Sequence, residues 1–200
     1  MGLLTKFQLM CKVLQLGKVA NHPKTFALTY DRERKKNADM AKRAHGSMFV
    51  KLDTGDVPQT PEAIASEAEL RGLVGEKLVN SSGKLALLDR LMLAKRKCGS
   101  RVLVFTQFTL TLDVLEEYVK HRFGSIGVAY LRLDGNTGRI QREMDMRSFN
   151  KPGCGIFCYL ISTRAGGQGI NLASGTSHQF FNDLNPSDAC SHIKLFTTLR

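Results

Sequence analysis

The sequence contains no apolar run long enough to cross a membrane, which takes about 20 consecutive residues. Its opening stretch, MGLLTKFQLMCKVLQLGKVA, is rich in apolar side chains, but Lys6, Lys12 and Lys18 interrupt it. A secretory signal needs a continuous apolar region and a cleavage site, and this stretch has neither. We therefore expect no secretory leader and no membrane partner.

Paired cysteines are also lacking. The five cysteines are odd in number and show no paired spacing, which argues against a disulfide framework and favours a reducing compartment. Cys154 and Cys158 are four residues apart and would share one face of a buried strand. Because no second Cys or His pair with ligand spacing accompanies them, we interpret both as small core residues and predict no metal site.

Acidic residues are scarce, since 18 Asp and Glu stand against 29 Lys and Arg, and the formal net charge is +11. Basic surface gains affinity for a polyanion by releasing condensed counterions, so a polyanionic partner is expected. Residues 1–51 hold eleven basic and three acidic residues, whereas residues 52–78 hold two and six. The run DRERKK at 31–36 is typical of a solvated helical face, with nuclear targeting or phosphate contact as alternatives.

These shifts in composition divide the chain. With 42% apolar and 24% charged residues, the sequence is that of a globular protein. We predict a basic helical extension over 1–51, whose first helix ends before Pro23. An acidic loop or linker follows over 52–79, with a short helix after Pro61. Residues 80–183 then alternate regularly between helical and strand patterns.

Within this regular region, apolar spacing predicts helices over 81–98, 109–124 and 139–150. Continuous apolar runs predict buried strands over 101–107, 128–135 and 155–161, and a short fourth strand over 178–183. Strands that alternate with helices indicate βαβ units. The predicted fold class is therefore α/β, a parallel sheet flanked by helices, with a mostly helical N-terminal extension.

Polar residues gather where the predicted strands end. Thr106 and Gln107 close the first strand, Asp134 and Gly135 the second, and the glycine-rich stretch STRAGGQGINL follows the third at 162–172. Ligands of parallel sheets bind beyond the carboxyl ends of the strands. Each segment alone is also a good turn or helix cap, but together they predict an edge that faces phosphate groups.

An ordered set of motifs resembles the second, C-terminal RecA-like lobe of SWI/SNF-type and imitation-switch chromatin-remodelling ATPases, in helicase superfamily two. The motifs are LQLGKVANHP at 14–23, NSSGKLALLDRL at 80–91, RVLVFTQFTLTLDVLEEY at 101–118, YLRLDGNT at 130–137, RSFN at 147–150 and YLISTRAGGQGINLAS at 159–174. The dense part of the resemblance covers 80–174. It implies a RecA-like lobe over 80–183.

The resemblance implies roles for individual residues. In that family two lobes sandwich ATP and grip duplex DNA. Backbone phosphates of DNA would be contacted by Thr106, Gln107, Ser162, Thr163, Arg164 and Gly166. The nucleotide would be coupled to DNA by Gly167, Gly169 and Asn171. The edge would be supported by Arg132, Asp134 and Gly135. Amides, hydroxyls and a guanidinium recognise phosphate without reading bases, so binding would be independent of sequence.

Departures from the family pattern are concentrated at the two ends. The chain has no tryptophan, and only Asp183, Asn185 and Pro186 remain of an acidic, tryptophan-containing element. The arginine helix that should follow is absent, so residues 184–200 are interpreted as a diverged or truncated tail. No GxxxxGK[ST] loop is present, because Leu78 and Leu85 occupy two of its required positions. We expect a fragment that is inactive alone and that meets ATP and Mg only beside a first lobe.

Three functions remain open. The chain is interpreted first as the C-terminal lobe of an ATP-dependent chromatin-remodelling DNA translocase, with double-stranded DNA, nucleosomes and a missing ATPase lobe as partners in the nucleus. The alternatives are a non-catalytic module that binds DNA or nucleosomes, and an inactive relic. Binding of duplex DNA is expected to weaken when Arg164, or Lys35 and Lys36 together, lose their charge.

Overall fold

The computed structural model describes residues 16–43, 66, 68–166, 177–180 and 193–198. One five-stranded sheet has the order β2-β3-β1-β5-β4. Its strands are β1 (Arg101–Thr106), β2 (Ala129–Leu133), β3 (Ile156–Ser162), β4 (Ser177–Phe180) and β5 (Ile193–Thr198). β3 pairs in parallel with both β1 and β2, while β5 pairs antiparallel with β1 and β4 antiparallel with β5. The predicted parallel core is confirmed, and it carries an antiparallel extension.

The antiparallel extension includes one strand that was not predicted from the sequence. The short fourth strand is present as β4, but β5 lies within the segment interpreted from its sequence as a diverged tail. The sequence of β5, IKLFTT, is rich in β-branched and aromatic residues, which favour strands. The strand was not predicted because residues 184–200 were interpreted from the family motif that they lack and not from their strand preference. Among the described strands, β4 pairs with β5 alone and therefore lies at an edge of the sheet.

The helices that precede and connect the parallel strands are those predicted from the sequence. They are α5 (Gly83–Lys97), α6 (Thr109–Phe123), which continues into the single turn η1 (Gly124–Ile126), and α7 (Arg139–Asn150). A four-residue helix, α8 (Thr163–Gly166), follows β3. Ser82 caps α5, since its Oγ accepts a hydrogen bond from the backbone N–H of Leu85 at 3.4 Å.

The two faces of the sheet carry separate hydrophobic clusters. Side chains of a strand alternate between faces, so Val102 and Val104 of β1 point to one side and Leu103 points to the other. The first cluster joins β1 and β3 to α4 (Gly75–Asn80), α5 and α6. The second places Phe149 of α7 against Tyr159, with ring centroids 5.5 Å apart. The parallel strands are therefore buried on both faces, as their continuous apolar sequences predict.

α4 was not predicted, because its sequence falls inside the stretch interpreted as an acidic linker. Leu78 and Val79 of this helix are buried in the core, at 0% and 3% exposure. Gly75 begins the helix with φ +61°, and a Cβ there would lie 3.2 Å from the imidazole of His121. Glycine is favoured at this position on both counts. The predicted linker thus ends in a packed part of the lobe.

The N-terminal segment packs onto α4 and α5. Residues 16–21 are helical and the helix stops at His22, before Pro23, as predicted; residues 1–15 lie outside the described part. His22 Nε2 lies 2.9 Å from the carbonyl oxygen of Leu78, and its Nδ1 accepts the N–H of Lys24 at 3.1 Å. Ser82 Oγ donates to the carbonyl of Asn21 at 2.8 Å. The motif NHP therefore joins two segments that are about 60 residues apart in sequence.

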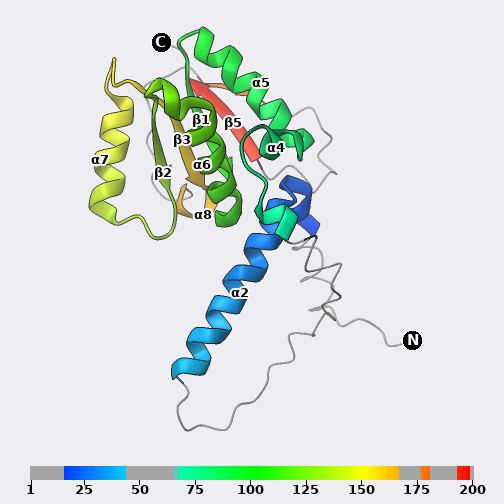
Figure 1. Cartoon of the computed structure of the whole chain (residues 1–200). Coiled ribbons are helices and arrows are strands. Elements are labelled where there is room, and N and C mark those ends of the chain that lie inside the picture. Colours follow the sequence, from blue (N-terminus) through cyan, green and yellow to red (C-terminus); the bar gives the residue numbers. More distant parts are fainter. Residues whose placement is uncertain (1–15, 44–65, 67, 167–176, 181–192, 199–200) are drawn as a thin grey trace, which may run out of the picture.

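α2 (Lys24–Arg43) starts at this junction and extends away from the lobe (Figure 1). Its first residue is buried, and Lys24 Nζ donates to the carbonyl of Leu73 at 2.7 Å and to both carboxylate oxygens of Glu117 at 2.8 and 2.7 Å. Arg71 and Asp31 form an ion pair at 2.9 Å further along. These contacts fix the first turns of α2 against α6 and against residues 71–73. Across the described ranges, no helix has the length and apolarity that a membrane span requires.

The buried imidazole of His22 predicts a dependence of stability on pH. Burial lowers its pKa below the usual 6.5, the hydrogen bond to Leu78 opposes this, and Lys24 adds to the lowering. Below about pH 6.5 the unfolded chain binds a proton that the folded chain excludes, so the free energy of unfolding falls as pH falls. Urea unfolding between about pH 5 and 7 measures the slope.

His22→Gln is expected to flatten this slope, since glutamine keeps an N–H donor and does not titrate. His121→Gln is the matched control, because His121 is a histidine whose side chain is 39% exposed. Equal slopes in wild type and His22→Gln would show that another group causes the pH dependence.

Candidate nucleic-acid interface

The carboxyl ends of the three parallel strands lie at one edge of the sheet. In the register of the sheet, Thr106 is opposite Ser162, and Leu133 is opposite Ile161. Asp134 directly follows Leu133 and therefore leaves the sheet beside Ser162. The structure thus confirms the prediction that the polar ends of these strands lie at one edge of the sheet.

β1 ends in a buried residue followed by an exposed one. Thr106 has no exposed surface, and its Oγ1 accepts the backbone N–H of Phe108 at 3.4 Å. This bond shapes the turn into α6. Gln107 stands between the two residues and is exposed. Thr106 therefore stabilises the turn at the end of β1 from a buried position, whereas Gln107 is accessible to solvent.

β2 ends in a network of charges centred on Arg132. Its guanidinium lies 2.7 Å from Asp113, 2.7 Å from Glu116 and 3.0 Å from Asp134. Although burial works against its charge, the three carboxylates raise the pKa of Arg132. Asp134 also accepts the backbone N–H of Asn136 at 2.9 Å, which closes a turn. Arg132 is thus paired with three carboxylates, and these ion pairs stabilise the edge of the sheet on which Gly135 lies.

β3 ends in α8, which presents the one arginine of the glycine-rich stretch. Ser162 is 2% exposed and Thr163 is half-buried, whereas Arg164 is exposed. No hydrogen bond or ion pair joins Arg164 to another residue within the described ranges. We call Gln107, Gly135, Thr163 and Arg164 the strand-end rim. Thr106, Asp134 and Ser162 are buried beneath this rim.

An arginine on a neighbouring helix holds α8 in place. Arg142 Nη2 of α7 donates to the carbonyl oxygen of Ala165 at 2.7 Å. This residue was not predicted from the sequence. Arg142, Asp145 and Phe149 are spaced i, i+3 and i+7, which places them on one face of the helix, and Asp145 and Phe149 are buried. That spacing is the signal that could have identified Arg142.

The remaining predicted site residues are only partly described. Gly166 is the last residue of α8. Gly167, Gly169 and Asn171, which the resemblance assigns to nucleotide coupling, lie outside the described residues. Where the structure describes the chain, no three His, Cys, Asp or Glu side chains are grouped so that they could hold a metal ion. The described chemistry of the rim is therefore one amide, one hydroxyl and one unpaired guanidinium, a set suited to phosphate oxygens.

Comparison with known proteins supports the resemblance. The chain is 47% identical over 113 residues to a "Probable chromatin-remodeling complex ATPase chain" of Oryza sativa subsp. japonica, covering 56% of this chain and 10% of the relative. It is 48% identical over 99 residues to the human "SWI/SNF-related matrix-associated actin-dependent regulator of chromatin subfamily A member 1", covering 50% and 9%. The chain thus spans about a tenth of the length of these relatives.

A solved structure of the C-terminal part of the Fun30 ATPase domain is 33% identical and covers 48% of this chain and 30% of its own, with a TM-score of 0.42. The model of the family described as "Helicase conserved C-terminal domain" matches residues 83–188. This match takes in all three parallel strands and the rim residues at their ends. Since it spans more than half of the sequence, the chain belongs to the helicase conserved C-terminal domain family.

Proposed function

We propose that this chain is the C-terminal lobe of an ATP-dependent chromatin-remodelling DNA translocase, and that its strand-end rim holds the backbone of duplex DNA. One observation carries the proposal: Arg164 is exposed and unpaired within the described residues, at the edge where three parallel strands end. The excess of basic residues, a net charge of +11, favours the same polyanion.

The composition of the rim favours contact with phosphates over reading of bases. A guanidinium can donate two hydrogen bonds to one phosphate, and amides and hydroxyls add single bonds. Such contacts position a protein on DNA and carry no sequence information. Asp134 would repel DNA if its charge were free, but Arg132 pairs with it at 3.0 Å. Binding is therefore proposed to be independent of sequence and strongly dependent on salt.

The names of the relatives are the basis for proposing where in the cell the chain acts. They are ATPase chains and regulators of chromatin, so we infer that this lobe acts on nucleosomal DNA in the nucleus. Hydrolase activity would belong to an assembly in which a first lobe binds ATP and Mg. In that assembly this chain would supply the surface that closes over the nucleotide and grips DNA.

A second candidate is a module that binds DNA or nucleosomes without catalysis. One observation favours it, because the Gly83-Lys84 pair is followed by Leu85, where a phosphate-binding loop needs Ser or Thr, and Leu85 is buried in the core. The pair therefore does not form a phosphate-binding loop. Both candidates share the rim and differ in whether a first lobe completes the site.

Arg164→Ala is expected to weaken binding of a short fluorescein-labelled duplex by a similar factor for unrelated DNA sequences. The slope of log affinity against log salt should lose about one unit, the contribution of one phosphate contact. Fluorescence anisotropy across a KCl series measures both quantities.

Arg147→Ala is the matched control. Arg147 is exposed like Arg164, but it lies near the end of α7, which leads to the opposite edge of the sheet. If the two substitutions lower the affinity and the slope equally, the effect is one of total charge and the rim is not the interface. If wild-type affinity does not change with salt, the phosphate argument fails altogether.

A further inference from the structure

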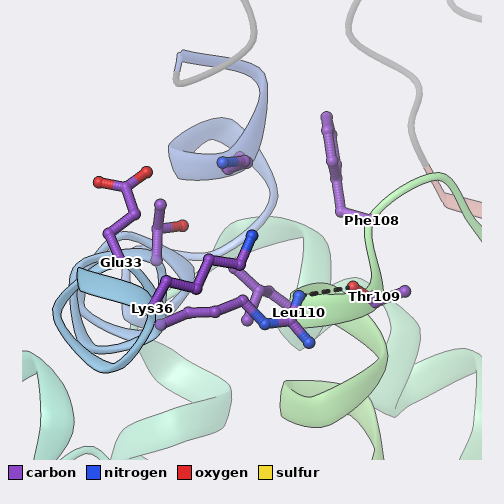
Figure 2. A pocket seen from close by; sticks show the side chains of 8 residues that line it. Glu33, Lys36, Phe108, Thr109 and Leu110 are labelled. Carbon is purple, nitrogen blue, oxygen red and sulfur yellow. Dashed lines mark hydrogen bonds between the residues drawn. The ribbon is translucent and has the colours of Figure 1, made fainter. Parts of the chain in front are cut away.

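A small pocket lies between α2 and the start of α6, next to the strand-end rim. Its volume is about 220 Å³. Figure 2 shows Glu33 and Lys36 of α2 on one side and Phe108, Thr109 and Leu110 on the other. The full lining, which we call the α2–α6 pocket, comprises Lys18, Thr29, Arg32, Glu33, Lys36, Phe108, Thr109 and Leu110.

The lining of the pocket carries a net positive charge. Lys18, Arg32 and Lys36 contribute three positive charges, and Glu33 contributes one negative charge. The 15-residue helix α6 begins at Thr109 with no acidic residue in its first turn. The first backbone N–H groups of a helix have no intrahelical acceptor and carry partial positive charge. Side chains and backbone therefore favour an anion at the same place.

The pocket is held in shape by bonds between its two walls. Arg32 Nη1 donates to Thr109 Oγ1 at 3.1 Å, the contact drawn as a dashed line in Figure 2. Nearer the start of α2, Lys24 is bonded to Glu117 of α6 at 2.7 Å. The cations of α2 consequently face the first turn of α6 before any ligand arrives, which lowers the entropic cost of binding.

The pocket continues the strand-end rim without a break in the chain. Gln107 of the rim directly precedes Phe108 of the pocket wall, and Phe108 N donates to Thr106 beneath the rim. Sites for whole small-molecule ligands have volumes of about 300–1,000 Å³. At about 220 Å³, the pocket suits a single phosphate group better than a complete nucleotide.

We propose that the α2–α6 pocket receives one backbone phosphate of the same DNA duplex that the strand-end rim contacts. This inference rests on the proposed function and places α2, which lies outside the family match, in the DNA interface. It also assigns different roles to Lys35 and Lys36, which were grouped together as DNA contacts in the sequence analysis. Lys36 lines the pocket, whereas Lys35 is exposed on α2 and does not.

The electrostatics of Lys18 agree with a site for an anion. Burial lowers the pKa of Lys18, Glu33 opposes this, and the charge of Arg32 adds to the lowering. A phosphate placed among these groups would relieve the repulsion between Lys18 and Arg32. The pocket would therefore hold the bound phosphate more tightly than three solvated cations would.

The test compares two double variants of the same helix. Arg32→Gln with Lys36→Gln removes two charges from the pocket, and Arg34→Gln with Lys35→Gln removes two exposed charges that do not line it. We expect the pocket pair to lower duplex affinity about fivefold or more and to reduce the salt slope by about one unit. The control pair should leave the slope within error of wild type. Charge-retaining Arg32→Lys with Lys36→Arg should restore most of the affinity.

Each outcome decides between the proposals. Equal effects of the two neutral pairs would show that α2 acts as a diffuse basic face, and the pocket proposal would be wrong. If neither pair matters while Arg164→Ala weakens binding, the rim is the interface and the pocket takes no part. If the wild-type chain binds a phosphorylated peptide but no duplex, the proposed function fails together with this inference. Circular dichroism verifies that all variants keep the fold.

Discussion

Replacing Asp89 with alanine is expected to lower the free energy of unfolding by about 3–5 kcal/mol, the range found when one partner of a buried ion pair is removed. Asp89 lies on α5 and is 7% exposed. Its Oδ1 accepts the hydroxyl of Tyr118 at 2.8 Å, and its two oxygens accept Arg122 Nε and Nη2 at 2.8 and 2.7 Å. Alanine would leave a buried hydroxyl without its acceptor and, among the described residues, would leave the guanidinium paired with the exposed carboxylate of Glu76 alone.

Urea unfolding of the purified chain measures this loss. Glu143→Ala is the control, because Glu143 pairs with Arg147 at 2.8 Å on the exposed face of α7, where a surface pair contributes about 0.5 kcal/mol or less. Tyr118→Phe should cost about 1 kcal/mol, since it removes one hydrogen bond and leaves the ion pair intact. A loss below about 1 kcal/mol for Asp89→Ala would show that this ion pair does not hold α5 to α6.

The second large effect concerns catalysis. The 200-residue chain is expected to hydrolyse no ATP above a buffer blank, with or without duplex DNA. The Gly83-Lys84 pair could suggest a phosphate-binding loop, but its lysine makes a structural contact: Lys84 Nζ donates to Asn21 Oδ1 at 3.2 Å. The next residue, Leu85, is 2% exposed and packs in the core. Where arginine fingers act on phosphoryl transfer, their loss costs about 10³–10⁵ in rate, and the arginine helix that the family resemblance implies is absent from this sequence.

A coupled assay of ADP release measures the turnover. Lys84→Ala identifies the source of any signal, because a contaminating ATPase would be unaffected by it. Activity that co-elutes with the chain, rises with DNA and disappears in Lys84→Ala would overturn the prediction. Such a result would favour a self-sufficient nucleotide site over the proposed lobe or binding module.

Local pattern was sufficient to predict the parallel core. α7 has the predicted limits, Arg139–Asn150, and Lys151-Pro152 ends it. Its apolar pattern is only partly buried, since Phe149 lies in the core whereas Ile140 and Met144 are exposed. α4, in contrast, was not predicted from the sequence. Its six residues have too few turns for periodicity, and it is stabilised by contacts such as His22 with Leu78, which are 56 residues apart. No short window of sequence contains that information.

The candidate site was predictable in outline and incomplete in detail. The parallel arrangement alone places Thr106, Asp134 and Ser162 at one edge. Which side chains reach solvent depends on tertiary packing, so the burial of Thr106 and Ser162 and the exposure of Arg164 emerge only from the structure. The α2–α6 pocket likewise joins side chains more than 70 residues apart, such as Arg32 and Thr109.

A titration of the ¹⁵N-labelled chain with a short DNA duplex, followed by amide NMR shifts, tests the central claim most directly. We predict that the amides of Thr106–Leu110 and of Ser162–Ala165 shift together, while those at the opposite edge, such as Ser100 and Gly155, stay unchanged. Shifts confined to that opposite edge, or none at saturating DNA, would contradict the assignment of the strand ends as the DNA-binding surface.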